Sequence, residues 1–193
     1  MAFNALDHMI DCPKRDDLLE KAHQHIVFDC ALFRDPDDAV RCNDGHLEFA
    51  VETIVNRHNC QRLARKQARY RDPALNWLKK RHNVELKPTK VVVETPKHDP
   101  AMVKRFVNDV LQPMDPWELA AVASLSHLLR SYVLALATLQ GEISPQHAVS
   151  AFRVDEDHQT DEWGRVEGGH DLDDAYLNLG ARAAFTFHQL SGR

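Results

Sequence analysis

The most distinctive feature of the chain is an apolar stretch from residue 117 to residue 139, in which Ala, Leu and Val predominate. Asp115 is suited to cap a helix that begins here, Pro116 fits the first turn, and Glu118 completes a capping box. The few polar side chains within the stretch recur at helical spacing, so one long helix that is apolar on most sides is predicted. Such a helix has to be buried, and Gly141 is expected to end it.

A second helix is predicted directly after this turn, because Ser144 and Pro145 repeat the cap and first-turn signals. The two helices form an αα-hairpin. Steps of three, four and seven residues place one carboxylate on the same helix face as apolar neighbours. The residues of this face are Val149, Phe152, Glu156 and Trp163.

Glu156 has two interpretations that the sequence leaves open. A carboxylate at the end of a helix is usually solvated or paired, and Arg130 of the facing helix is the candidate partner. Alternatively Glu156, flanked by Asp155 and Asp157, is presented to a binding partner.

The remaining patterns also predict mainly helices. They are expected at 3–10, from about 14 to 26, at 48–71, from Asp72-Pro73 onward, after Asp99-Pro100 and from about Leu172. The last of these is expected to bury Tyr176, Leu179, Ala183 and Phe187.

We therefore predict a mainly α protein, a multi-helix bundle built on the C-terminal αα-hairpin, with at most one or two short strands around 84–93. An N-terminal helical segment, 1–71, is expected to precede a C-terminal helical core, 72–193, within one continuous domain.

Basic side chains crowd the second half of the helix predicted over 48–71, between residues 57 and 71. A basic helix can bind phosphates, but this one lacks interleaved aromatic side chains and belongs to a chain of net charge −5. A solvated face is therefore favoured, and no nucleic-acid partner is predicted. The alternative is a helical adaptor that binds an acidic protein or nucleic acid through this helix.

No membrane insertion, metal or cofactor is predicted. Glu118, His127 and Arg130 interrupt the apolar stretch, and charges near the centre of a helix disfavour insertion into a bilayer. The four cysteines stand far apart and are expected to be reduced thiols. The best candidate zinc ligands lack the usual spacing of a zinc motif. They are Cys42, His46, His58 and Cys60.

One feature is typical of an enzyme, the His-Asp dipeptide that occurs as His98-Asp99 and His170-Asp171. Helical metal-dependent phosphohydrolases use such a dyad with a second histidine upstream, for which His147 is the candidate, and an aspartate well downstream. Only adjacent aspartates follow the second dipeptide. The favoured interpretation is that His170 and Asp171 cap the last helix, so the protein is not predicted to be an enzyme.

Several motifs over residues 72–190 together resemble a known family. They are DPALNWLKKRHNVEL, MDPWELAAVASLSHLLRSYVLALATLQGEISPQHAV, the acidic DED at 155–157 and WGRVEGGHD. In this order they resemble the mitochondrial ATP synthase assembly chaperones that bind the α subunit of the soluble catalytic sector. Members of that family usually carry an organelle presequence and a β-rich N-terminal domain, and no segment of this chain corresponds to either.

The resemblance implies a non-enzymatic chaperone of the mitochondrial matrix that needs no cofactor and holds the unassembled α subunit until it meets its β partner. We expect the hairpin and the acidic cluster to contact this client, with Glu156 as the most consequential charge. The candidate client-binding residues are Asp155, Glu156, Asp157, Trp163, Glu167, His170 and Asp171.

Overall fold

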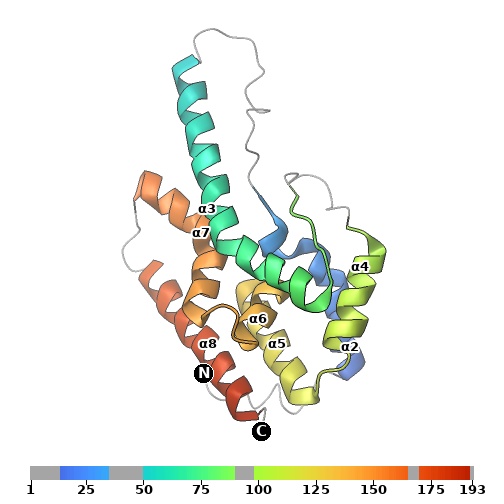
Figure 1. Ribbon diagram of the computed structural model, residues 1–193. Helices are drawn as coiled ribbons and strands as arrows, with labels where there is room; N and C mark the ends of the chain where they lie inside the picture. Colours follow the sequence, from blue (N-terminus) through green and yellow to red (C-terminus); the bar gives the residue numbers. More distant parts are fainter. Residues whose placement is uncertain (1–13, 35–49, 90–97, 165–169, 192–193) are drawn as a thin grey trace.

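The structure is a computed structural model that describes residues 14–34, 50–89, 98–164 and 170–191, with the backbone alone for 50–60. It confirms the mainly α fold (Figure 1). The helices are α2 (Arg15–His25), α3 (Ala50–His82), α4 (Pro100–Arg105), α5 (Pro116–Leu129), α6 (Tyr132–Leu139), α7 (Pro145–Trp163) and α8 (His170–Ser191). Two short 3₁₀ turns, η1 (Ile26–Phe28) and η2 (Cys30–Leu32), follow α2, and a π-helical segment, η5 (Phe106–Leu111), continues α4. The helix predicted over 3–10 lies outside the described residues.

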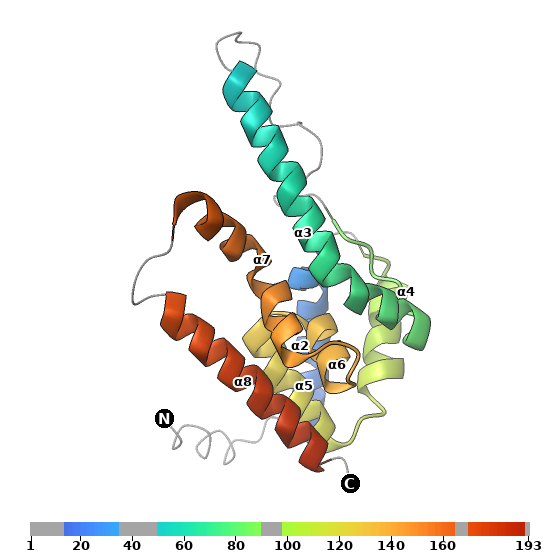
Figure 2. The same cartoon turned by 60° about the vertical axis from the view of Figure 1, so that its left-hand side comes forward.

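Helix α6 is the centre of the core. All of its residues from Val133 to Leu139 are buried, and it packs against α3, α5, α7 and α8 (Figure 2). This environment explains why the sequence there is apolar on every side, since no face of α6 from Val133 to Leu139 reaches water. None of the helices in the described part of the chain combines the length and apolarity needed to cross a membrane.

The prediction of one long helix over 117–139 is wrong, because the chain breaks between α5 and α6. Arg130 adopts the left-handed conformation (φ 47°, ψ 34°), and the side chain of Ser131 accepts a hydrogen bond from the backbone N–H of Leu134 as the cap of α6. The buried carboxylate of Asp29 accepts a further bond from the N–H of Val133 at 3.0 Å. Side chains thus accept hydrogen bonds from the backbone N–H groups that the break leaves unpaired. The break can therefore be buried in the core without the cost of unsatisfied donors.

The prediction of a separate helix from Asp72 is also wrong. Helix α3 runs without interruption from Ala50 to His82, with Pro73 inside it. Figure 1 shows that α3 changes direction in its second half, as expected when a proline removes one backbone donor and crowds the preceding turn. The predicted division into an N-terminal segment, 1–71, and a C-terminal core, 72–193, stays a prediction. Helix α3 crosses that boundary and belongs to both parts.

The only pairing of extended backbone within the described residues is a parallel bridge between Phe33 and Thr89. The N–H of Thr89 donates to the carbonyl of Leu32 at 2.7 Å, and the N–H of Arg34 donates to the carbonyl of Thr89 at 2.9 Å. Of the extended segment predicted around 84–93, residues 84–89 form only this one bridge. Residues 90–93 lie outside the described part.

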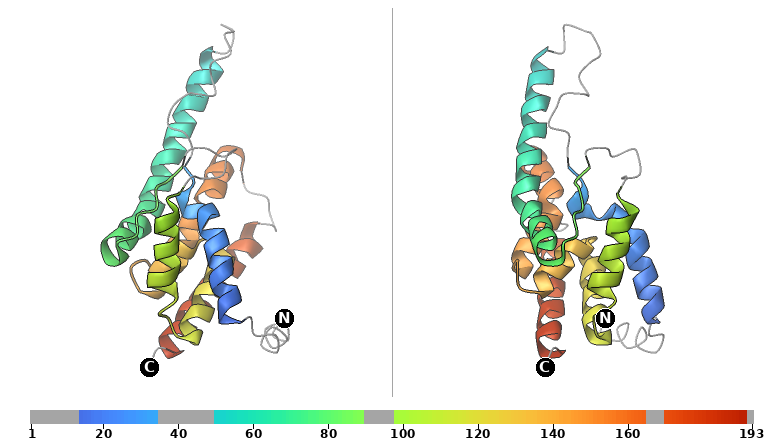
Figure 3. Two further views of the ribbon diagram at one scale, coloured as in Figure 1. Left: turned by 90° about the vertical axis from the view of Figure 1, so that its right-hand side faces the viewer. Right: turned by 45° about the vertical axis from the view of Figure 1, so that its right-hand side comes forward.

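Helix α2 packs beside α4 and η5 and against α5 (Figure 3). Arg15, at its start, donates to the backbone carbonyls of Gln112 and Met114 in the loop before α5. The caps predicted for α4 and α5 are confirmed, since Asp99 accepts from the N–H of Ala101 and Asp115 forms a complete capping box. These contacts close one side of the bundle around α5.

Candidate functional site

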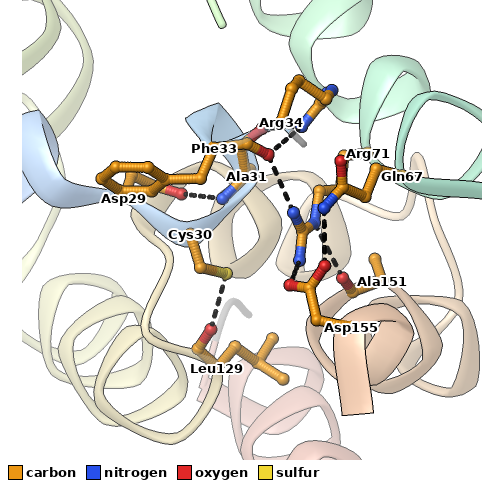
Figure 4. Close-up of polar contacts among 10 residues, drawn as sticks. All are labelled: Asp29, Cys30, Ala31, Phe33, Arg34, Gln67, Arg71, Leu129, Ala151 and Asp155. Atoms are coloured by element: carbon orange, nitrogen blue, oxygen red, sulfur yellow. Dashed lines mark hydrogen bonds and ion pairs between the residues drawn. The ribbon is translucent and has the colours of Figure 1, made fainter. Parts of the chain in front are cut away.

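Asp155, the first residue of the acidic cluster on α7, faces α3. Its carboxylate lies 2.6 Å from Nη2 of Arg71 and 2.6 Å from Nε2 of Gln67 (Figure 4). Arg71 also donates to the backbone carbonyls of Phe33 at 2.9 Å and Ala151 at 3.1 Å. Its side chain is 1% exposed, whereas that of Asp155 is 47% exposed. One buried guanidinium therefore joins the segment after α2 to α3 and α7.

The prediction that the basic stretch ending at Arg71 is a solvated face is wrong for Arg71 itself. The buried side chains of α3 repeat every three or four residues, which defines one helix face. They are Ala64, Gln67, Arg71, Ala74 and Leu78. This spacing is present in the sequence, but the surrounding run of basic residues concealed it.

Arg153 holds the rest of the acidic cluster and links α7 to α8. Its side chain is 3% exposed and lies 3.1 Å from the carboxylate of Glu156, 3.6 Å from that of Asp157 and 2.7 Å from that of Asp174. The carboxylate of Glu156 also lies 2.8 Å from Nδ1 of His170, the first residue of α8. The acids of α7 are thus paired within the protein, and each keeps part of its surface in solvent.

The predicted pair of Glu156 with Arg130 is not formed. Glu156 is 39% exposed and contacts Arg153 and His170, while Arg130 lies at the break between α5 and α6, on a pocket shared with α2. The partner of Glu156 on its own helix is Arg153, three residues earlier, and not a residue of the facing helix as predicted. Spacing of three residues is the signal that finds it.

The other candidate residues differ in how far they reach solvent. Trp163, the last residue of α7, is 83% exposed, and Asp171 is exposed in the first turn of α8. Glu167 lies outside the described residues. The expected face shared by Val149, Phe152, Glu156 and Trp163 is therefore buried at its start and open at its end.

Helix α8 carries an exposed apolar stripe, which we call the α8 outer face. The prediction that Tyr176, Leu179, Ala183 and Phe187 are buried is wrong, because all four are exposed. Leu172 and Leu179 are each 71% exposed and Tyr176 is 67% exposed. The ring of Phe187 lies 6.1 Å from that of Trp117, which is itself exposed on α5. The α8 outer face comprises Leu172, Tyr176, Leu179, Ala183, Phe187 and Leu190.

A second stripe of α8, made largely of small residues, packs against the bundle. Ala181 is buried, Leu177 and Ala184 are partly buried, and a Cβ atom added at Gly180 would lie 2.9 Å from a methyl carbon of Leu128 on α5. Small side chains let the backbone of α8 approach α5 closely. Both stripes of α8 have the periodicity of a buried helix face. The sequence analysis predicts that the stripe of bulky residues is buried, but the stripe of small residues is the one that packs against the bundle.

Acidic residues near the tip of α7 pair with the basic part of α3. Nζ of Lys66 lies 2.7 Å from the carboxylate of Asp161, and Nη1 of Arg62 lies 3.4 Å from that of Glu162. The hydrogen bond from Lys66 lowers the pKa of Asp161. The exposed cations Arg65 and Arg69 lie beside them on α3, so the solvated face predicted there is present in part.

The histidines proposed for a phosphohydrolase have separate partners. The ring of His147 lies 2.9 Å from the carbonyl of Tyr70, whereas that of His170 contacts Glu156. Among the described residues, no three His, Cys, Asp or Glu side chains are grouped as a metal site would require. Of the zinc candidates, Cys42 and His46 lie outside the described residues, and the side chains of His58 and Cys60 are not described.

No model of a known protein family matches the chain. Among solved structures it is similar to Atp12 from Paracoccus denitrificans, with a TM-score of 0.73 and 23% identity over 93% of this chain and 66% of that one. A candidate chaperone from Agrobacterium tumefaciens is similar with a TM-score of 0.67 and 22% identity, over 91% of this chain and 57% of that one. These similarities establish a shared fold, and the chain spans 66% or less of the length of these proteins.

Proposed function

We propose that this chain is an assembly chaperone that binds the unassembled α subunit of mitochondrial ATP synthase and prevents its aggregation before it pairs with the β subunit. The observation that carries the proposal is the exposed α8 outer face in a chain with the fold of Atp12. The motifs over 72–190 support the identity of the client, and they also support a location in the mitochondrial matrix.

The physical requirements of such a chaperone match this surface. An unassembled subunit exposes apolar surface that its neighbour would cover, and such surface aggregates. A protein that shields it needs a complementary apolar face, charges at the edge that set the register, and a contact weak enough to be displaced. The α8 outer face and Trp163 supply the apolar part, and Asp171 lies exposed at the start of α8.

The acidic cluster has a different part in this proposal. Because Glu156 pairs with Arg153 and His170, it positions the start of α8. Asp155 and Asp157 act at the edge through the exposed parts of their side chains, and Glu167 stays a predicted contact. Neither a bound cofactor nor a chemical step takes part in the proposed function.

The test is capture of newly made α subunit by this chain, with the β subunit and an unrelated aggregation-prone protein as controls. We expect selective capture of the α subunit and less aggregation of it. Replacing Leu172 and Leu179 together by Ser should weaken capture about tenfold or more, since two apolar contacts are lost. Both side chains are largely exposed, so the thermal unfolding midpoint should stay close to that of the wild type.

The matched control replaces the exposed cations Arg65 and Arg69 by Glu, far along the chain from α8. A client-binding role for α8 requires this variant to capture the α subunit normally. Loss of capture in the Arg65 and Arg69 variant, with normal capture in the Leu172 and Leu179 variant, would instead support the helical adaptor. Absence of selective capture by the wild-type chain would overturn the proposal.

A further inference from the structure

A pocket of about 460 Å³ lies between α2 and the junction of α5 with α6. Lys21 and His25 enter it from α2, His127 and Arg130 enter it from the end of α5, and the rings of Phe28 and Tyr132 line it. None of these residues belongs to the proposed client surface. The pocket is therefore separate from the surface proposed to bind the client.

Local structure brings these basic side chains together. Lys21 and His25 are four residues apart and share a face of α2, and His127 and Arg130 are three residues apart at the end of α5. Arg130 is the residue that turns into the left-handed conformation at the break in the apolar stretch. An arginine is unusual at such a position, where Gly or Asn is easier to accommodate.

Within the part of the chain that the structure describes, the charges of this pocket are not balanced by nearby acids. Among the described residues, neither Lys21 nor Arg130 has a carboxylate within 4.0 Å, whereas Arg34, Arg71 and Arg153 all form ion pairs. The residues of the described part that line the pocket include no acid. In a chain of net charge −5, two cations that line one pocket and have no carboxylate partner among the described residues are an arrangement that attracts an anion.

We propose that this pocket binds a phosphate group. The positive charges of Lys21 and Arg130 match the two charges of a phosphate dianion. The guanidinium, the ammonium and two imidazole rings also offer more donors than the two oxygens of a carboxylate accept. The rings of Phe28 and Tyr132 form an apolar wall beside the cations. The phosphate is therefore either the free ion or the monoester of an organic molecule, and the wall favours the monoester.

Tyr132 contributes its ring to this apolar wall. Its hydroxyl is partly buried and shares a hydrogen bond with the side chain of Ser126. Because the Ser126 hydroxyl donates to the carbonyl of Ala123, the tyrosine hydroxyl is the donor to Ser126 and is held in place at the edge of the pocket.

The experiment is a titration of the full chain, followed by the backbone amide signals in NMR spectra at constant ionic strength in sodium chloride. The three probes are inorganic phosphate, phenyl phosphate and benzoate. We expect saturable shifts at residues 21–28 and 126–132 with both phosphate compounds, and tighter binding of phenyl phosphate if the aromatic wall contributes. Benzoate should bind at least about tenfold more weakly than phenyl phosphate, because it carries one charge fewer.

Two variants and one control locate the site. Lys21→Gln on the exposed face of α2 should weaken phosphate binding several-fold without disturbing the fold. Arg130→Asn, which retains a residue suited to the left-handed conformation, should weaken it about tenfold. Lys104→Gln removes an exposed charge on α4 and should bind as the wild type does.

The two phosphate probes distinguish the source of the group, since equal affinities identify the free ion and a preference for phenyl phosphate identifies a monoester. Either result supports the site. The proposal is overturned if neither compound produces saturable shifts in the pocket, if benzoate binds as well as phenyl phosphate, or if both variants bind like the wild type.

Discussion

Two buried arginines, Arg71 and Arg153, determine where the acidic side chains of α7 point. A buried cation is costly unless it is paired and hydrogen-bonded, so each guanidinium holds its carboxylates close. In each pair the arginine side chain is buried, whereas the carboxylate side chain is partly exposed to solvent. The acidic cluster at 155–157, which the sequence analysis predicts to bind the client, therefore also pairs with buried arginines of the protein itself.

Replacing Glu156 by Lys tests this arrangement at the residue scale. The new ammonium would lie beside Arg153 and His170, so the start of α8 should be displaced and client capture should fall. We expect a loss of about 2 kcal/mol in the free energy of unfolding, because the pair is partly screened by solvent. Urea denaturation and the capture assay measure the two effects.

The conservative variant Glu156→Gln keeps a hydrogen-bond acceptor at this position and should retain most of the client capture. Asp161→Lys is the charge-matched control on the same helix, at an exposed pair with Lys66, and should be less destabilising. Equal losses of stability in Glu156→Lys and Asp161→Lys would contradict the assigned role of Glu156.

Asp29 provides a prediction for the dependence of stability on pH. Burial raises the pKa of its carboxyl group in the folded state, and hydrogen bonds from Ser131 and Val133 only partly oppose this. The folded protein thus binds a proton more readily than the unfolded chain. This group should add stability as the pH falls through its folded pKa, and the gain should level off below its unfolded pKa.

The measurement compares urea denaturation of the wild type with that of Asp29→Asn between pH 7 and pH 4. The stability difference should move in favour of the wild type as the pH falls, by at most about 1.4 kcal/mol per pH unit. Contributions from the other titrating groups cancel in this comparison. A difference that moves in favour of Asp29→Asn on acidification would show that the carboxylate is stabilised, not destabilised, by its surroundings.

At the scale of elements, the break between α5 and α6 depends on adjacent residues with opposite effects. Ser131→Ala removes the cap of α6 and should cost about 1–2 kcal/mol of unfolding free energy. Arg130→Gly relieves an unfavourable left-handed backbone and should raise stability by up to about 1 kcal/mol. Thermal and urea unfolding of the two variants give the signs, and destabilisation by both changes would mean that Arg130 contributes through its side chain.

The elements also show what sequence patterns can and cannot predict. The caps at Asp99, Asp115 and Ser144 were correct, because they depend on neighbouring residues alone. The break at Arg130 was missed, since part of its support comes from Asp29, about a hundred residues earlier. The exposed stripe of α8 was misassigned because hydrophobic periodicity gives the orientation of a stripe but not which of two stripes finds a partner.

At the scale of the whole molecule, the helical class and the hairpin with its tight turn followed from the sequence. Local propensity and periodicity are sufficient for a fold of this kind, in which the central helix α6 is apolar on all sides. The candidate site was predicted less completely. Glu156 and His170 are in contact, whereas Asp155 faces α3. The spacing along α7 is enough to indicate Arg153 as a partner of Glu156, but the pair of Arg71 with Asp155 depends on packing between helices that no local pattern reveals.

The contacts of Arg71 also constrain how the protein is made. Its guanidinium is satisfied only when Phe33, Ala151 and Asp155 are all in place. A ribosome delivers these residues in order, so the nascent chain cannot complete this junction until Asp155 has emerged from the exit tunnel. During most of its own synthesis the polypeptide therefore lacks this junction, and a chain that is not yet fully folded exposes apolar surface that is prone to aggregate.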